Sequence, residues 1–121
     1  ETFDIANKYK ISLNYDTHIN NHLITRDIQL NLFRIAQEQL RNIFKHASAT
    51  AINVEVLIAN NRLKMRITDN GNGFNAKEDK KGIGLANMKR RAEVFFGRLE
   101  IKSSLGKGCE IKVDIPLPEV G

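Results

Sequence analysis

The chain has 121 residues, of which 41% are hydrophobic and 27% charged, a composition typical of one soluble globular domain. No apolar run approaches the roughly 20 residues that a membrane-spanning helix needs, and a single cysteine, Cys109, excludes an internal disulfide. The net charge is +5, but the basic residues are scattered and aromatic content is only 7%. This favours a positive field around a polyphosphate, or a solvated surface, over a nucleic-acid partner. Because the chain does not begin with Met, we expect it to be a piece of a longer protein.

The first element is predicted to be a strand over residues 4–14. Ile11 and Leu13 alternate with polar residues, and this period of two is typical of a strand with one buried face. A polar loop is predicted to follow and to end in Thr25, whose hydroxyl is placed to cap a helix.

A helix is predicted over residues 28–47, where apolar residues recur at spacings of three and four. The face expected to be buried consists of Leu32, Ala36, Leu40, Ile43 and Ala47. Glu38 and Asn42 lie four residues apart on the opposite face and are therefore neighbours. This pair is either part of a solvated helix surface or a carboxylate and an amide oxygen presented to one ligand, a combination suited to Mg²⁺.

A β-hairpin is predicted next. Apolar and polar residues alternate over 51–59, and residues 63–68 are predicted to return as the second strand. Asn60 and Asn61 are predicted to form the two-residue turn between them, because Asn tolerates positive φ. The second strand then delivers Asp69 to a glycine-containing segment.

Two glycine-containing breaks flank a short charged segment. Residues 69–73 read DNGNG, and glycine there permits close approach of the backbone to a ligand. Residues 75–81 are too short and too charged to pack and are predicted to form a mobile lid. Residues 82–85 read GIGL and precede a helical pattern, where free N–H groups favour phosphate. The alternative is a pair of ordinary turns around a surface loop.

The last third is predicted to hold a helix over residues 85–96, ended by Gly97, and two strands over 99–103 and 110–115 joined by a glycine-rich turn. The expected core face of this helix consists of Leu85, Met88, Ala92, Phe95 and Phe96. The predicted fold is a two-layer α/β sandwich whose mixed, largely antiparallel sheet is covered on one face by helices, in a single domain over residues 1–121.

The order and spacing of four motifs resemble the GHKL ATPases, which share the Bergerat ATP-binding fold. Residues 38–47 (EQLRNIFKHA) resemble the N box, 69–73 the G1 box, 82–85 the G2 box and 106–108 (GKG) the last glycine motif. The resemblance is closest to the catalytic ATP-binding domain of sensor histidine kinases of the nitrate/nitrite-sensor type. It covers most of the chain.

The resemblance implies a role for each matching residue. Asp69 would accept a hydrogen bond from the adenine amino group, and as a pure acceptor it would repel the O6 atom of guanine. Asn42 would bind Mg²⁺, with Glu38 acting as a general base or holding metal-bound water. Lys45 and His46 would face the phosphates, although a structural role at a helix end is an equal interpretation for His46.

The other implied contacts with ATP come from glycine-rich backbone, namely from Gly71, Gly73, Gly82, Gly84, Leu85, Gly106 and Gly108. The chain departs from the family pattern in three places. The lid is short and lacks a phenylalanine-containing F box, which fits the nitrate-sensor type. Cys109 stands where Thr or Ser is usual, and Arg90 stands where Glu is frequent, so Arg90 receives no role.

The resemblance implies that the chain binds Mg-ATP and donates the γ-phosphate to a histidine on a separate dimerisation helix, which passes it to a response regulator. His18 and His22 lack the acidic neighbour of the phosphoacceptor motif, so the chain alone is expected not to phosphorylate itself. A cytoplasmic domain is expected, with any membrane anchor in domains outside it. The alternatives are an anti-sigma-factor-type serine kinase and a non-catalytic nucleotide-binding interaction module of the same fold.

Overall fold

The protein is described from a computed structural model, which covers residues 10–15, 24–47, 49–73 and 84–117. The predicted lid, Gly82, His18, His22 and the first part of the predicted N-terminal strand lie outside these residues.

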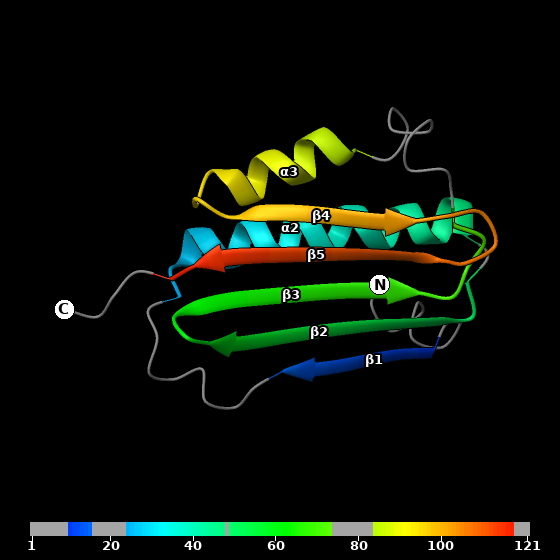
Figure 1. The fold of residues 1–121 in the computed structure, drawn as a ribbon, viewed down its shortest axis with the longest axis horizontal. Coiled ribbons are helices and arrows are strands. Elements are labelled where there is room, and N and C mark those ends of the chain that lie inside the picture. Colours follow the sequence, from blue (N-terminus) through cyan, green and yellow to red (C-terminus); the bar gives the residue numbers. More distant parts are fainter. Residues whose placement is uncertain (1–9, 16–23, 48, 74–83, 118–121) are drawn as a thin grey trace.

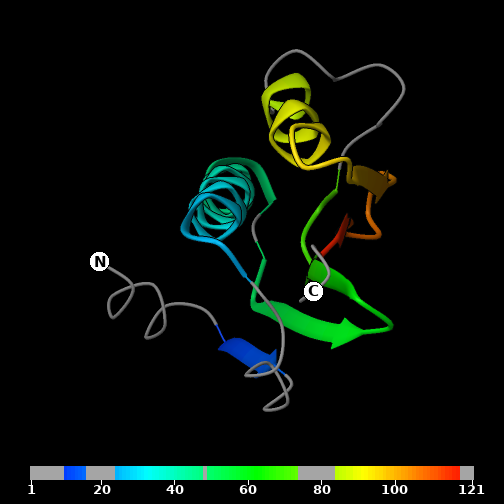
Figure 2. The same cartoon turned by 90° about the vertical axis from the view of Figure 1, so that its left-hand side faces the viewer.

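One five-stranded sheet forms the base of the fold (Figure 1), with the strand order β1-β2-β3-β5-β4. Its strands are β1 (Lys10–Tyr15), β2 (Ala51–Ala59), β3 (Arg62–Asp69), β4 (Arg98–Ser103) and β5 (Cys109–Pro116). β1 runs parallel to β2, and the other three pairings are antiparallel. Figure 2 shows both helices on the same face of this sheet. The predicted mixed two-layer sandwich is therefore confirmed.

The helical layer consists of α2 (Arg26–Asn42) and α3 (Leu85–Glu93), and α2 continues into a π-helical segment, η2 (Ile43–Ala47). The Thr25 hydroxyl accepts a hydrogen bond from the Ile28 N–H at 3.2 Å, so the predicted cap is present. π-Helical turns are rare and often occur at functional sites. This one carries the last residues of the N-box-like motif.

Alternation along β3 and β5 builds the core. Met65 pairs with Val113 and Ile67 with Ile111, and all four side chains are buried beneath the helices. On α2 and at the start of η2 the buried residues are Ile28, Ile35, Gln39 and Ile43. Ile43 of the predicted face is buried as expected, whereas Leu32, Ala36 and Leu40 pack against the core only partly buried, so the predicted face is displaced by part of a turn. The α3 helix also packs against α2, where Arg91 donates a hydrogen bond to Asn31, while Gln39 faces the sheet through its bond to Cys109. The covered face of α2 therefore depends on both the sheet and α3.

The end of α3 also differs from the prediction. Phe96 is 90% exposed and adopts φ 61, so it lies outside the core and takes the left-handed position that usually ends a helix. Gly97 has no positive φ, but a Cβ there would lie 2.5 Å from the Asp114 carbonyl oxygen and 2.7 Å from Ile115 Cγ1. Gly97 is therefore required for close packing rather than for ending the helix.

The hairpin between β2 and β3 agrees with the prediction. Asn60 and Asn61 have φ values of 55 and 59, as a two-residue turn with left-handed backbone requires. The strand after this turn keeps one face buried up to Ile67, so Asp69, two residues later, lies on the helical side of the sheet.

Candidate functional site

Asp69 supplies the one buried side-chain polar atom without a hydrogen-bond partner among the described residues. Its Oδ1 accepts a hydrogen bond from the Gly71 N–H at 2.8 Å, while Oδ2 is buried and has none. Burial raises the pKa of this carboxyl, and the Gly71 N–H opposes that rise. Native proteins seldom leave such an acceptor unsatisfied, and a ligand that donates one hydrogen bond would satisfy it.

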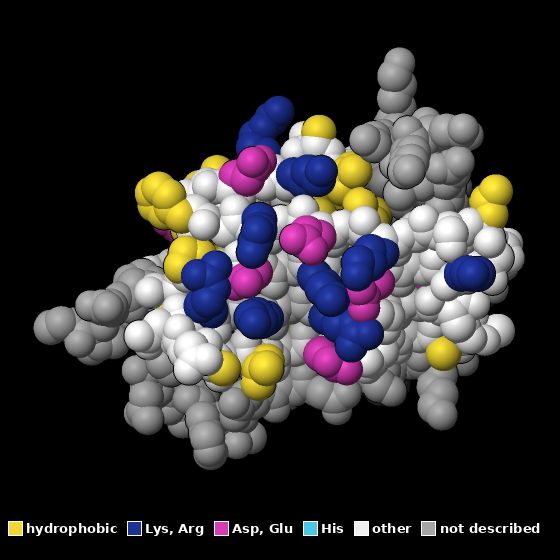
Figure 3. Space-filling view, viewed as in Figure 1, with side chains coloured by type: hydrophobic (Ala, Val, Ile, Leu, Met, Phe, Trp, Pro, Cys, Tyr) yellow, Lys and Arg dark blue, Asp and Glu magenta, His cyan; other side chains and the backbone are white. Residues whose placement is uncertain are grey.

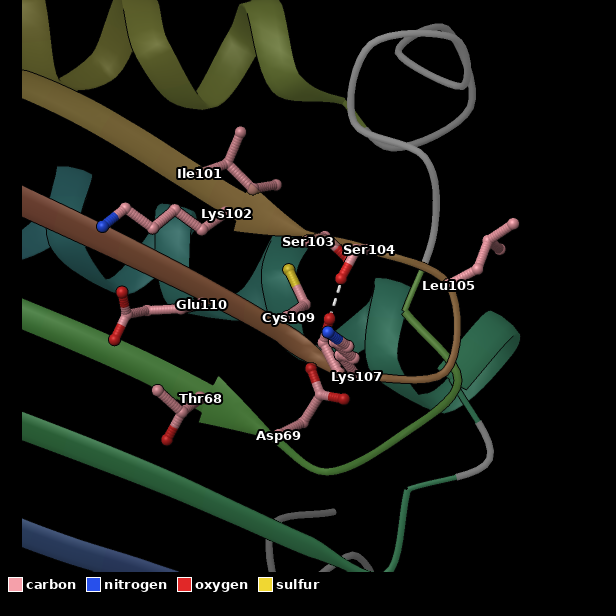
Figure 4. A pocket seen from close by; sticks show the side chains of 11 residues that line it. Thr68, Asp69, Ile101, Lys102, Ser103, Ser104, Leu105, Lys107, Cys109 and Glu110 are labelled. Carbon is pink, nitrogen blue, oxygen red and sulfur yellow. Dashed lines mark hydrogen bonds between the residues drawn. The ribbon is translucent and has the colours of Figure 1, made fainter.

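Asp69 lies in the wall of a cavity of about 760 Å³, a size suited to a nucleotide-sized ligand. Figure 4 shows its carboxylate below the Cys109 thiol, with Ile101 and Ser103 from β4 above them. The Ser103 hydroxyl donates a hydrogen bond to the Gly108 carbonyl oxygen at 2.8 Å. Three adjacent strands therefore contribute to a wall that combines a carboxylate with apolar surface.

The G1-like loop and the turn after β4 interlock. A Cβ at Gly108, where φ is 77, would overlap the Asp69 carbonyl oxygen, and a Cβ at Gly73 would lie 2.7 Å from the Gly108 carbonyl oxygen. The Gly106 N–H also donates a hydrogen bond to the Asn72 carbonyl oxygen. Two of the four predicted motifs thus form one packed unit, and glycine is needed where their backbones touch.

Asn70 ties this unit to the start of β2. Its Oδ1 accepts hydrogen bonds from the Thr50 N–H at 3.0 Å and the Ala51 N–H at 2.9 Å, and its Nδ2 donates to the Thr50 hydroxyl at 2.9 Å. The loop that follows Asp69 is therefore held by the turn after β4 on one side and by the start of β2 on the other. This anchoring role of Asn70 was not predicted from the sequence.

The N-box-like and G2-like motifs also meet. Glu38 on α2 forms an ion pair with Arg41 at 3.5 Å, and its carboxylate lies against the Cα of Gly84. Gly84 is the N-cap of α3, with φ 65 and no side-chain cap. The first N–H groups of α3 therefore lie beside an acidic side chain, at a helix end that favours anions.

Asn42 is half-buried at the last position of α2. Its Nδ2 donates a hydrogen bond to Gln39 Oε1 at 3.5 Å, and Gln39 Nε2 donates to Cys109 Sγ at 3.5 Å. Burial raises the pKa of the Cys109 thiol to about 11, with a further rise from the charge of Asp69. Gln39 was missed from the sequence, although a polar residue four positions after Ile35 on a buried helix face was a detectable signal.

The other residues predicted to contact ATP make few described contacts. Lys45 is exposed on η2, and nothing is described of the His46 side chain. Leu85 is buried in the core, so only its backbone is suited to a polar contact. Among the described residues no three His, Cys, Asp or Glu side chains cluster as a metal site. Glu38 and Asn42 offer one carboxylate and one amide.

The outer face of the sheet carries many charges (Figure 3), and acidic and basic side chains alternate on it. Arg62 pairs with Asp114 at 2.8 Å, while Arg66 and Lys112 pair with Glu110 at 2.6 and 3.7 Å. Among the residues that the structure describes, the basic side chains on this face are thus interspersed with acids and form no continuous basic stripe. No helix in the described part of the chain is long and apolar enough to cross a membrane.

Comparison with known proteins gives a match to one family and to several individual relatives. The model of the family described as "Histidine kinase-, DNA gyrase B-, and HSP90-like ATPase" matches residues 27–119. The chain is 36% identical over 115 residues to the sensor histidine kinase LiaS and 33% identical over 120 residues to the histidine-protein kinase/phosphatase DegS, both of Bacillus subtilis. These alignments cover 94% and 96% of the chain but only 31% of each relative.

Two further similarities extend the comparison. The chain is 29% identical over 113 residues to the oxygen sensor histidine kinase NreB of Staphylococcus carnosus, an alignment that covers 92% of the chain and 33% of that relative. The fold is similar to that of the blue-light activated histidine kinase of Erythrobacter litoralis, with a TM-score of 0.72 at 18% identity over 91% of the chain and 36% of that structure. The isolated histidine kinase domain of the same protein gives 0.69 at 20% identity over 94% of the chain and 55% of that structure.

Proposed function

The chain belongs to the family of histidine kinase-, DNA gyrase B- and HSP90-like ATPases, and on this premise we propose that it is the ATP-binding catalytic domain of a histidine kinase. Membership of the family implies ATP binding. The proposal extends this to Mg-ATP as the phosphoryl donor and a protein histidine as the acceptor, as in two-component signalling. The names of the relatives support this choice within the family.

The buried Oδ2 atom of Asp69 carries the proposal. Asp69 lines the cavity and its Oδ2 is an acceptor without a partner, and the exocyclic amino group of adenine is a donor that fits such an acceptor. Guanine offers a carbonyl oxygen at the equivalent edge, so the same carboxylate would repel it. The apolar side chain of Ile101 supplies the neighbouring surface that a planar base requires.

The phosphate end of the site is proposed to lie between α2 and α3. Asn42 and Glu38 would hold Mg²⁺, directly or through water, because Mg²⁺ binds a few protein oxygens and otherwise retains waters and phosphate oxygens. Gly82 and Gly84 would offer backbone N–H groups to the phosphates, and Lys45 and His46 would add positive charge. Mg²⁺ itself would neutralise charge on the phosphates during transfer.

Several parts of the reaction are proposed to come from elsewhere. The chain spans about a third of the length of the curated relatives it matches, and the acceptor histidine is proposed to lie on a dimerisation domain outside this sequence. A response regulator would take the phosphoryl group from that histidine. Incubation of the chain alone with labelled ATP should therefore leave it unphosphorylated, and label on the chain would contradict this assignment.

Calorimetric titration tests the proposal directly. A nonhydrolysable ATP analogue should bind the chain more tightly with Mg²⁺ than without it, and the matching GTP analogue should bind far more weakly. Asp69→Asn should lose adenine binding by roughly 10- to 100-fold, the worth of a hydrogen bond to a charged group. Absence of binding to a folded wild-type chain would instead indicate a non-catalytic interaction module of the same fold.

A further inference from the structure

Gln39 is the one buried polar side chain of the described residues, with 2% of its surface exposed. Ile35 and Ile43 precede and follow it on the same buried face of the helix, at its apolar contact with the sheet. An amide in such a place is unfavourable unless its donors and acceptors are used. Its hydrogen bonds therefore indicate why an amide occupies this position.

Both ends of the Gln39 amide are used. Nε2 donates to Cys109 Sγ on β5, and Oε1 accepts from Nδ2 of Asn42. Cys109 in turn is the register partner of Asp69. The Gln39 amide thus connects two parts of the proposed site. On one side is the β3–β5 strand pair that carries Asp69, and on the other is Asn42, the proposed metal ligand.

The direction of these bonds determines how Asn42 is oriented. An asparagine amide has an oxygen on one side and an NH₂ group on the other, and only the oxygen can ligate a cation. Gln39 Oε1 is an acceptor and therefore selects the NH₂ group of Asn42. Cys109 Sγ accepts the Nε2–H bond, and this leaves Oε1 directed at Asn42.

We propose that Gln39 is a positioning residue that holds the Asn42 amide with its oxygen toward Mg²⁺, and that Cys109 anchors Gln39 in this orientation. The inference rests on the proposed function of Asn42 as a metal ligand. Gln39 itself touches neither nucleotide nor metal. It acts through Asn42, in the way that outer hydrogen-bond partners orient the ligands of other metal sites.

The test separates metal binding from nucleotide binding. Gln39→Met keeps the length and apolar packing of the side chain but removes its acceptor. Titration of MgCl₂ into the chain saturated with a nonhydrolysable ATP analogue should give a Mg²⁺ affinity roughly 10- to 100-fold weaker than that of wild type. Binding of the analogue in EDTA should be unchanged. Gln37→Met, on the exposed face of the same helix, is the matched control and should behave as wild type.

A structural role for Gln39 predicts a different pattern. If Gln39→Met weakened nucleotide binding equally with and without Mg²⁺, or changed neither, the inference would be overturned. A wild-type chain that bound no nucleotide would overturn the proposed function as well, so the two failures are distinguishable.

Two further variants keep the test decisive if Gln39→Met is poorly folded. Cys109→Ala removes the acceptor that holds Gln39, whereas Cys109→Ser retains one, so only the alanine variant should weaken Mg²⁺ binding. In an Asn42→Asp background both side-chain termini are oxygens, and orientation no longer matters. There Gln39→Met should cause no additional loss of Mg²⁺ affinity. Equal effects of the two Cys109 variants, or a persistent loss in the Asn42→Asp background, would contradict the proposal.

Discussion

The Glu38 carboxylate lies against the Cα of Gly84, so that any Cβ at Gly84 would overlap Glu38 Oε1. This contact joins the middle of α2 to the N-cap of α3. It brings an acidic side chain of the N-box-like motif beside the helix end proposed to bind phosphate. The two motifs are therefore in contact, and Gly84 has both a conformational and a steric requirement.

Gly84→Ala should weaken binding of the Mg²⁺–nucleotide complex by roughly tenfold, because the added methyl displaces Glu38 from its place beside the proposed metal. The substitution should also lower the free energy of unfolding by about 1 kcal/mol, because alanine is strained in the left-handed backbone conformation of Gly84, where φ is 65. Calorimetry and urea denaturation measure the two effects separately.

Gly106→Ala is the matched control for this variant. Gly106 has φ 80, but a Cβ there would meet no atom within 4 Å. Its substitution should therefore produce a similar loss of stability of about 1 kcal/mol and a smaller loss of affinity. Because Gly106 itself belongs to a motif implied to contact ATP, only a loss of affinity at Gly84 that exceeds the loss at Gly106 would be assigned to displacement of Glu38.

Asp69→Asn should make the fold more stable at neutral pH. Because burial raises the pKa of Asp69, its contribution to stability is present below pH 3.8 and is lost as the pH rises through the folded pKa. The wild-type chain thus bears the cost of a buried charge at pH 7, and the variant does not. Urea denaturation from pH 3.5 to 7 should show an advantage of the variant that grows with pH.

Glu110→Gln provides a control of opposite sign. Burial alone would raise the pKa of Glu110. The hydrogen bond and charge of Arg66 and the charge of Lys112 outweigh burial and lower this pKa below 4.5. Its stabilisation is present above pH 4.5 and is lost as the pH falls through the folded pKa. Glu110→Gln should therefore be less stable than wild type at pH 7. Identical pH trends for the two variants would refute the assignment of these shifts.

Adenine binding should depend on the same titration. Only the ionised Asp69 carboxylate is a pure acceptor, so affinity for the ATP analogue should fall as the pH falls, with a midpoint above the ordinary value of 3.8. Calorimetric titrations across this range check the prediction, with a folded-state probe such as circular dichroism at each pH. Constant affinity down to pH 4 would count against Asp69 as the base-reading group.

Cys109 should react slowly with iodoacetamide. A thiol whose pKa is raised from 9.0 to about 11 has roughly 100-fold less thiolate at pH 8, and the side chain is also buried. Mass spectrometry should show slow alkylation of the native chain and fast alkylation in denaturant. The chain has a single cysteine, so the readout is unambiguous. Comparable native and denatured rates would mean that the β5 end opens readily.

Phe96→Gly should raise the free energy of unfolding by about 1 kcal/mol, because glycine adopts the left-handed conformation without the cost that Phe incurs. Little packing is lost, since the Phe96 side chain is 90% exposed. Gly97→Ala is expected to have the opposite effect, because its Cβ would meet the Asp114 carbonyl oxygen and Ile115. Thermal and urea denaturation measure the free energy of unfolding of both variants. An unchanged free energy of unfolding in Phe96→Gly would show that Phe96 is not strained.

Features that depend only on neighbouring residues could be predicted from the amino-acid sequence. Alternating apolar residues indicated the strands, Thr25 indicated a helix cap, and Asn60-Asn61 indicated a tight turn. Each of these follows from local backbone preference and side-chain period, which need no tertiary partner. The order of the glycine motifs also pointed to the family before any contact was known.

Contacts between residues that are far apart in the chain became visible only in the folded structure. The Glu38–Gly84 contact and the Gln39–Cys109 bond join segments far apart in the chain. Helical periodicity placed the buried face of α2 a fraction of a turn away, because contacts with both the sheet and α3 select the face that is covered. For the same reason Gly97 looked like a helix end, whereas the approach of β5 is what excludes a side chain there. Long-range packing is a property of the assembled layers, and no local pattern specifies it.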